Sequence, residues 1–167
     1  MDRRTFLKTA AISSIGLSVP ALDPLSTLAA PPTPDLSIVH GPSPEKIVRA
    51  AVEALGGIKR FISRGDVVVV KPNIGWDRVP EQAGDTNPEV VAAVVKLCYE
   101  AGAKKVKVFD RPVNDPRRCY IQSGIEPAAR AVDADVTHMD ERKFKETAIN
   151  GLALTTWPLY SEIFEAD

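Results

Sequence analysis

The stretch Val67-Val68-Val69-Val70-Lys71-Pro72-Asn73 decides the fold of this chain. Four consecutive valines favour a strand that is covered on both faces, which is typical of an interior strand in a parallel sheet. Lys105-Val106-Lys107-Val108-Phe109 alternates polar and apolar residues and predicts a second strand. Between them, apolar residues at helical spacing predict a helix, so the three elements form a strand–helix–strand unit with a right-handed crossover.

Local signals set the expected limits of the helices. Thr86 and Glu89 have the spacing of a capping box, so we expect Thr86 to cap the helix between the two strands. Gly102 is expected to end that helix as its C-cap. Upstream, Ser43-Pro44 is expected to begin an amphipathic helix that Gly56-Gly57 interrupts.

A weaker second unit follows the second strand. We expect a short helix over Ile125 to Val132, a third strand over Ala134 to His138, a tight turn at Asn150-Gly151 and a helix start over Tyr160 to Glu165. The predicted fold class is α/β, a partial doubly wound (Rossmann-like), mostly parallel sheet with βαβ units. We expect a proline-rich tether over residues 30–44 and the α/β domain over residues 45–167, incomplete at its C-terminal end because three strands make a thin sheet.

Composition excludes several classes of protein. The chain has 167 residues, 44% of them hydrophobic and 26% charged, which is ordinary for a folded domain and excludes a mainly disordered one. With 21 basic against 22 acidic residues, it lacks the positive excess of a sequence-blind nucleic-acid binder. The two cysteines, Cys98 in a helix core and Cys119 in a polar loop, are too few for an iron–sulfur cluster in this chain. The cofactor is left open, and no metal site is expected.

The N-terminus resembles a twin-arginine signal peptide. It has the paired residues Arg3 and Arg4, followed by Phe6, Leu7 and Lys8 and then by a weakly apolar stretch. Small residues permit cleavage after Ala29, and no cysteine follows to carry a lipid. We therefore expect residues 1–29 to engage the twin-arginine translocase. The mature protein would be periplasmic or extracytoplasmic, without a stable membrane anchor. The alternative is an amphipathic first helix that stays attached.

Ligands bind beyond the carboxyl ends of the strands in an open parallel sheet. Lys71, Asn73 and Trp76 follow the first predicted strand, and Asp110 and Arg111 follow the second. Lys71 is either an anion ligand or an amine with a lowered pKa, because it directly follows four valines. The alternative is that Lys71 pairs with Asp110 across the two strands while Trp76 closes the edge of the core.

Two further features carry both a binding and a structural interpretation. Thr86 lies at a helix N-terminus, where an anion is favoured, although plain capping is the simpler explanation. Asp110 and Arg111 together fit a cation or phosphate site, or a structural ion pair. Arg111 also begins a polar stretch, up to Gly124, that is expected to be a lid or a solvated loop.

The pieces Val67–Asn73, Thr86–Val91 and Ala101–Val106 together resemble the domain-of-unknown-function 362 family. The resemblance covers Ser43 to the end, and Lys71, Asn73 and Thr86 match its motif residues. It implies an α/β fold, twin-arginine export in many members and, in some, a joined ferredoxin-type iron–sulfur module. Members usually continue well past the position of Asp167, so the resemblance also implies a C-terminally truncated chain.

The resemblance names no substrate, because the activity of that family is not established. We expect an exported protein that binds a small anionic ligand at the carboxyl ends of its strands, through Lys71, Asn73, Trp76, Thr86, Asp110 and Arg111. Whether it is an enzyme is left open. The alternatives are a non-catalytic binding or maturation factor for a redox (iron–sulfur) partner, and an inactive N-terminal fragment.

Overall fold

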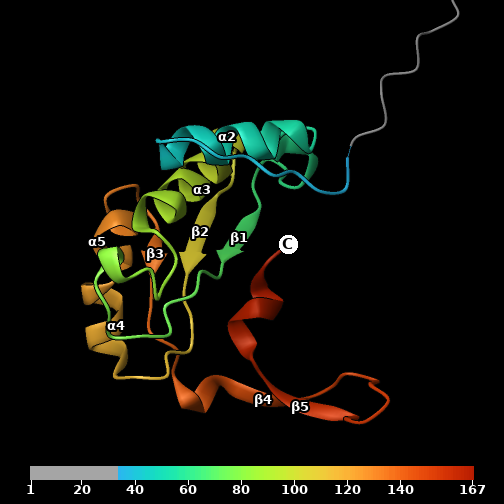
Figure 1. Cartoon of the computed structure of the whole chain (residues 1–167). Coiled ribbons are helices and arrows are strands. Elements are labelled where there is room, and N and C mark those ends of the chain that lie inside the picture. The colour runs from blue at the N-terminus through green and yellow to red at the C-terminus, as the bar shows by residue number, and fades with distance from the viewer. Residues whose placement is uncertain (1–33) are drawn as a thin grey trace, which may run out of the picture. The chain divides into compact units, whose positions relative to one another are not determined.

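The computed structural model of this chain describes residues 34–167 (Figure 1). The predicted signal peptide, residues 1–29, therefore lies outside the described residues. Three parallel strands form the main sheet in the order β1-β2-β3, with bounds Val67–Val70, Lys105–Val108 and Asp135–Val136. The α-helices are α2 (Pro44–Ala54), α3 (Pro88–Ala101), α4 (Pro116–Gln122) and α5 (Ile125–Arg130).

The parallel pairing confirms the predicted α/β fold class. Val67 pairs with Lys105 and Val70 with Val108, so β1 and β2 run side by side over their full lengths. β3 pairs with the end of β2, where Lys107 lies opposite Asp135. α3 connects β1 to β2, and α4 and α5 connect β2 to β3, as the βαβ pattern predicts. None of the helices in residues 34–167 has the length and apolar character needed to cross a membrane.

The position of β1 differs from the expectation. In the described residues β1 is an edge strand, not an interior one, and its four valines are half-buried. Only the start of its outer edge has a partner, because the Val67 N–H donates to Asp167 Oδ2 at 2.8 Å. The four valines are explained by apolar contacts on both faces of the strand. Val68 and Val70 pack against the helix-side core. Val69 faces the opposite side of the sheet, where it lines a pocket.

Helix limits agree with the local signals except at α3. Ser43 accepts a hydrogen bond from the Lys46 N–H as the predicted cap of α2, and Gly56 and Gly57 both have positive φ after that helix. The cap of α3 is Asn87, whose side chain accepts from the Glu89 and Val90 N–H groups. The prediction that Thr86 caps this helix was therefore wrong by one residue. Because Pro88 occupies the first helical position, the cap must be the residue immediately before it.

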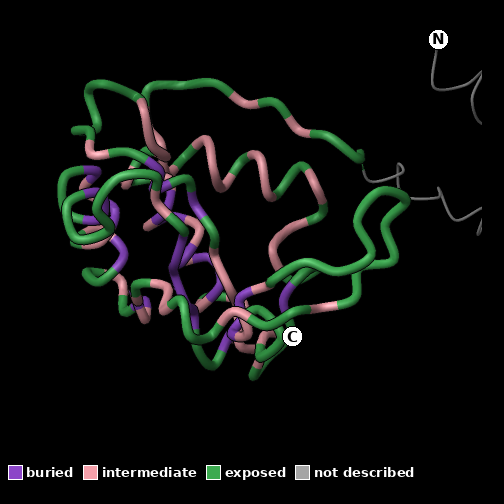
Figure 2. Tube along the Cα trace, turned by 90° about the horizontal axis from the view of Figure 1, so that it is seen from below, coloured by how far each residue is buried: buried purple, intermediate pink, exposed green. Residues whose placement is uncertain are grey.

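The core lies between the sheet and one layer of helices. α3 packs on β1 and β2, and α5 packs beside α3 and on β3. Val106 and Val108 of β2 and Ile125 of α5 are completely buried. Figure 2 shows that buried residues concentrate in the middle of the trace, whereas the outer segments are exposed. Burial of these apolar side chains is the main stabilising term on this face of the sheet.

Two parts of the structure were not expected: the helix after Arg111 and the hairpin near the C-terminus. The polar stretch after Arg111 contains α4, which buries Cys119 and Tyr120, so it is neither a free lid nor a solvated loop. After the 3₁₀ helix η3 (Glu141–Lys143), β4 (Phe144–Ala148) and β5 (Thr156–Tyr160) form an antiparallel hairpin. The turn is longer than the tight turn predicted at Asn150-Gly151, since residues 149–155 lie between the strands.

The C-terminal segment covers the other face of the sheet. A 3₁₀ helix, η4 (Ser161–Glu165), follows β5 and brings the carboxylate of Glu162 to Lys107 of β2 at 3.2 Å. Lys107 also pairs with Glu165 at 2.7 Å, and Lys143 pairs with Glu162 at 2.5 Å. The Lys143 ammonium, together with Lys107, lowers the pKa of Glu162 to about 2. We call these four side chains the Lys107–Glu162 network.

Candidate functional site

Lys71 and Asp110 meet at the carboxyl ends of β1 and β2. Lys71 Nζ lies 2.5 Å from Asp110 Oδ1. The Lys71 side chain is 66% exposed, whereas that of Asp110 is only 6% exposed. The second carboxylate oxygen, Oδ2, accepts a hydrogen bond from the Ile74 N–H at 2.8 Å. Both oxygens of this buried carboxylate are therefore satisfied, and Asp110 fixes the position of the Lys71 ammonium.

The main chain of Asp110 is held in turn by Tyr120 of α4. The Asp110 N–H donates to the Tyr120 hydroxyl at 2.8 Å, and that hydroxyl lies 2.9 Å from the Asp110 carbonyl oxygen. Burial raises the pKa of Tyr120 to about 12, so the phenol stays protonated at neutral pH. Sequence reasoning missed this residue. The Asp115-Pro116 pair, which caps and begins α4, was the local signal that would have indicated a helix there.

Arg111 follows Asp110 at the end of β2, but its side chain contacts other residues. Its guanidinium donates to Glu141 at 3.1 Å and lies over the ring of Phe144, 5.0 Å from the centroid. The side chains of Arg111 and Glu141 are 62% and 73% exposed. The ion pair that the sequence offered as an alternative is thus present, but with Glu141 as the partner, while Asp110 pairs with Lys71. Exposed pairs of this kind contribute little to stability.

A pocket of about 340 Å³ lies between these strand ends and the β4–β5 hairpin. Its charged lining residues are Lys71, Asp110 and Arg111. The remaining lining is apolar or aromatic and comes from β1, the segments that follow β2 and β3, the hairpin and η4: Val69, Phe109, Met139, Phe144, Trp157, Pro158, Leu159, Tyr160 and Ile163. The structure therefore brings together three of the six predicted binding residues and adds a set of hairpin residues that the sequence did not indicate.

Asn73 and Thr86 do not line this pocket but brace the loop that follows β1. The Asn73 N–H donates to Thr86 Oγ1 and the Thr86 N–H donates to the Asn73 carbonyl, both at 2.9 Å. The Asn73 side chain donates to the Gly84 carbonyl and accepts from the Gly75 N–H. These bonds fix the turn that presents the Ile74 N–H to Asp110. Asn73 and Thr86 thus support the pocket from outside it.

Trp76 also lies outside the pocket. The residue is 44% exposed, and its main-chain N–H donates to Asp85 Oδ1 at 3.0 Å. The tryptophan that lines the pocket is Trp157 of β5, which is 50% exposed. The indole expected beside Lys71 therefore comes from a distant part of the chain. The β-forming residues of Thr156–Tyr160 were the signal for that strand, although Pro158 weakens it.

The two cysteines are free and buried. Burial raises the pKa of Cys98 to about 11, and burial also raises that of Cys119, so neither thiol is ionised at neutral pH. Cys119 lies in α4, not in a polar loop. Within residues 34–167, no group of three histidine, cysteine or acidic side chains is arranged to hold a metal ion.

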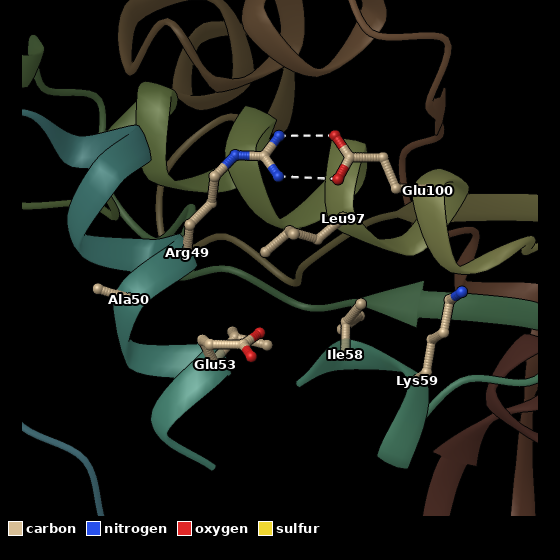
Figure 3. Close-up of a pocket in the computed structure, with 8 residues that line it drawn as sticks. Arg49, Ala50, Glu53, Ile58, Lys59, Leu97 and Glu100 are labelled. Carbon is tan, nitrogen blue, oxygen red and sulfur yellow. Dashed lines mark hydrogen bonds and ion pairs between the residues drawn. The ribbon is translucent and has the colours of Figure 1, made fainter. Parts of the chain in front are cut away.

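A larger cavity, of about 520 Å³, lies on the helix side between α2, α3 and the short 3₁₀ helix Ile58–Arg60 (Figure 3). Arg49 and Glu100 face each other across it, with nitrogen–oxygen distances of 2.6 and 2.8 Å. Arg49 and Glu100 are thus partnered with each other, and the cavity is remote from the carboxyl ends of the strands. The pocket of Lys71 and Arg111 is the better candidate site because it lies where open parallel sheets bind ligands.

Comparison with known proteins places the chain in a family. Residues 68–167 match the family described as "Domain of unknown function (DUF362)". The chain belongs to this family. Every residue that lines the pocket falls within the matched residues, whereas α2 precedes them.

One relative is the Thylakoid-associated protein sll1697 of Synechocystis sp.. It is 35% identical to this chain over 89 residues, which are 53% of this chain and 28% of the relative. This DUF362 chain thus matches little more than a quarter of the relative's length. No solved structure matches the chain.

Proposed function

We propose that this DUF362 chain binds a small anionic ligand at the carboxyl ends of its parallel strands. The observation that carries the proposal is that Lys71, after β1, and Arg111, after β2, line one pocket. An ammonium has three hydrogen-bond donors and a guanidinium has five, so each side chain has donors left after its present ion pair. Two such cations at one opening fit a carboxylate or phosphate group.

The two cations differ in how firmly they are held. Asp110 is buried and bonded to the Ile74 N–H, so it holds Lys71 in place and acts as a positioning residue. Glu141, in contrast, is largely exposed and can swing away from Arg111. Exchanging an exposed pair for a ligand costs about 0–1 kcal/mol, so an incoming anion can take the place of Glu141. In this proposal Lys71 is the fixed contact and Arg111 the adaptable one.

The brace of Asn73 and Thr86 has a positioning role in this proposal. It fixes the turn that carries the Ile74 N–H, and this N–H orients the Asp110 carboxylate. Thr86→Val would therefore loosen Lys71 without touching the ligand. The expected result is weaker anion binding that Thr86→Ser restores, because the serine keeps the hydroxyl acceptor.

A titration with acetate and with inorganic phosphate, followed by protein NMR at constant ionic strength, tests the proposal. Arg111→Gln should weaken anion binding by about tenfold, the loss expected for one charge-assisted hydrogen bond. Lys71→Gln should also weaken it, with the melting temperature measured to detect misfolding. Lys104→Gln removes an exposed charge just before the start of β2 and should leave binding unchanged. Equal anion affinity in wild type, Arg111→Gln and folded Lys71→Gln would exclude this function.

We also propose that residues 1–29 direct export by the twin-arginine route to a periplasmic or other extracytoplasmic compartment. The paired Arg3 and Arg4 support this, followed by Phe6, Leu7 and Lys8. The double variant Arg3→Lys, Arg4→Lys keeps the charge and should leave an uncleaved precursor in the cytoplasm. Cell fractionation and mass spectrometry of the product check this. Export that persists in the double variant would contradict the route.

A further inference from the structure

The walls of the pocket are aromatic and are ordered by contacts among themselves. Tyr160 packs edge-on against Phe109 at 5.2 Å between centroids and lies tilted against Phe144 at 5.3 Å. Arg111 lies over the ring of Phe144, so the cation and the apolar wall adjoin each other. If Arg111 holds the charged group of a ligand, the rest of that ligand would therefore contact this aromatic wall.

Apolar surface at the rim of the pocket is left open to water. Trp157 is 50% exposed and Ile163 is 38% exposed, and both line the pocket. An inorganic anion would engage only the charged end and leave these side chains in water. An uncharged hydrocarbon would cover them but would bring no partner for the free donors of Lys71. Only a molecule that has both a negative charge and an apolar body can bond to the free donors and cover the apolar rim at the same time.

We infer that the ligand is amphipathic: a compact hydrocarbon or aromatic body that carries one negative charge. This inference rests on the proposed function and names its substrate class. The lining contains two positive side chains, Lys71 and Arg111, and one negative side chain, Asp110. Once the ligand has taken the place of Glu141 on Arg111, a single negative charge balances this lining. A volume of about 340 Å³ is near the lower end for ligand pockets, which fits a small molecule and excludes a long lipid chain.

Three matched probes separate the contributions of charge and body. Cyclohexanecarboxylate carries both, acetate carries the charge alone, and cyclohexylmethanol carries the body alone. Each is titrated into the full chain at constant ionic strength, with the backbone amide signals of Arg111 and Phe144, which line the pocket, followed by NMR. Because the cyclohexyl group buries several methylenes, cyclohexanecarboxylate should bind at least about tenfold more tightly than acetate. It should also bind about tenfold more tightly than cyclohexylmethanol, since the alcohol lacks the charge-assisted bonds.

Variants of the hairpin test the wall itself. Trp157→Ala should weaken the binding of cyclohexanecarboxylate by about fivefold or more and leave the affinity for acetate unchanged, because only the hydrocarbon body contacts the indole. Leu152→Ala is the matched control, since Leu152 is fully exposed in the same hairpin and does not line the pocket. It should change neither affinity. If Trp157→Ala fails to fold, the comparison of the three probes on the wild-type chain still decides the inference.

The outcomes distinguish this inference from the function on which it rests. Equal affinities for cyclohexanecarboxylate and acetate would overturn the amphipathic ligand and leave the anion site intact. Equal affinities for cyclohexanecarboxylate and cyclohexylmethanol would overturn both, because the charge would then contribute nothing. Absence of binding by all three probes would also overturn both.

Discussion

The two faces of the main sheet are stabilised in different ways. On the helix side, Val106 and Val108 of β2 lie completely buried against α3 and α5. On the other side, Lys107 of the same strand is buried under η4 and is paired with Glu162 and Glu165. One face is held by apolar burial, and the other by ion pairs and the aromatic contact of Phe109 with Tyr160.

This difference explains where the pocket lies. On the helix side, the cavity of about 520 Å³ lies between α2 and α3, remote from the carboxyl ends of the strands. The opposite face is covered by a hairpin and a short 3₁₀ helix that contact the sheet at few points. The space left between them and the strand ends is the pocket of Lys71 and Arg111. The predictions below test the contrast between the two faces.

The largest effect is expected from a cavity in the helix-side core. Ile125→Ala should lower the free energy of unfolding by about 2–5 kcal/mol, because Ile125 is completely buried and its loss leaves a void. Ile121→Ala in the adjacent α4 is the control, since Ile121 is 57% exposed, and it should change stability by less than about 0.5 kcal/mol. Urea denaturation measures both. Equal effects would contradict the placement of the core.

A smaller and more local effect is expected on the opposite face. Glu162→Gln removes the charge that faces Lys107 and Lys143, and should cost about 1–3 kcal/mol because Lys107 is buried. Hydrogen exchange should quicken in η4 and leave α3 unchanged. Glu146→Gln, an exposed change on β4, is the matched control. Uniform loss of protection across the sheet would show that the two faces unfold together.

The Lys107–Glu162 network should make the free energy of unfolding depend on pH. The pKa of Glu162 is about 2, below its ordinary value of 4.5, so its stabilising contribution is complete above pH 4.5 and is lost as the pH falls towards 2. The pKa values of Lys107 and Lys143 are raised above 10.5, so their contribution is lost only when the pH rises beyond that value. Denaturation at pH 6 and pH 3 should show a smaller loss in Glu162→Gln than in wild type. An identical loss would assign the acid sensitivity to other carboxylates.

The smallest effect is expected at the helix-side ion pair of Arg49 and Glu100. Their side chains are 38% and 52% exposed, so water and salt screen the pair although its contacts are short. Glu100→Gln should change stability less than Ile125→Ala or Glu162→Gln, and the difference should vanish in 1 M salt. Thermal denaturation at low and high salt measures this. A salt-independent loss would show that the pair matters more than its exposure indicates.

Local signals predicted the parts of the fold that depend on neighbouring residues. The cap at Ser43, the glycines after α2, the C-cap Gly102 and the starts of β1 and β2 were all recognisable because each depends on a few adjacent residues. The same kind of signal was present but not used at α4, where Asp115 precedes Pro116. The edge position of β1 could not be predicted, since a run of valines indicates burial and does not say what covers each face.

The sequence by itself determined which side chains of β2 share a face, because Lys105-Val106-Lys107-Val108 alternates and side chains alternate along a strand. It also placed Lys71, Asp110 and Arg111 directly after strands, and so at one edge of the sheet. Only the tertiary structure decided what meets them. Lys107 and Glu162 are separated by 55 residues, and Trp157 reaches the pocket from a distant hairpin. No local periodicity encodes such meetings, because they depend on the path of the whole chain.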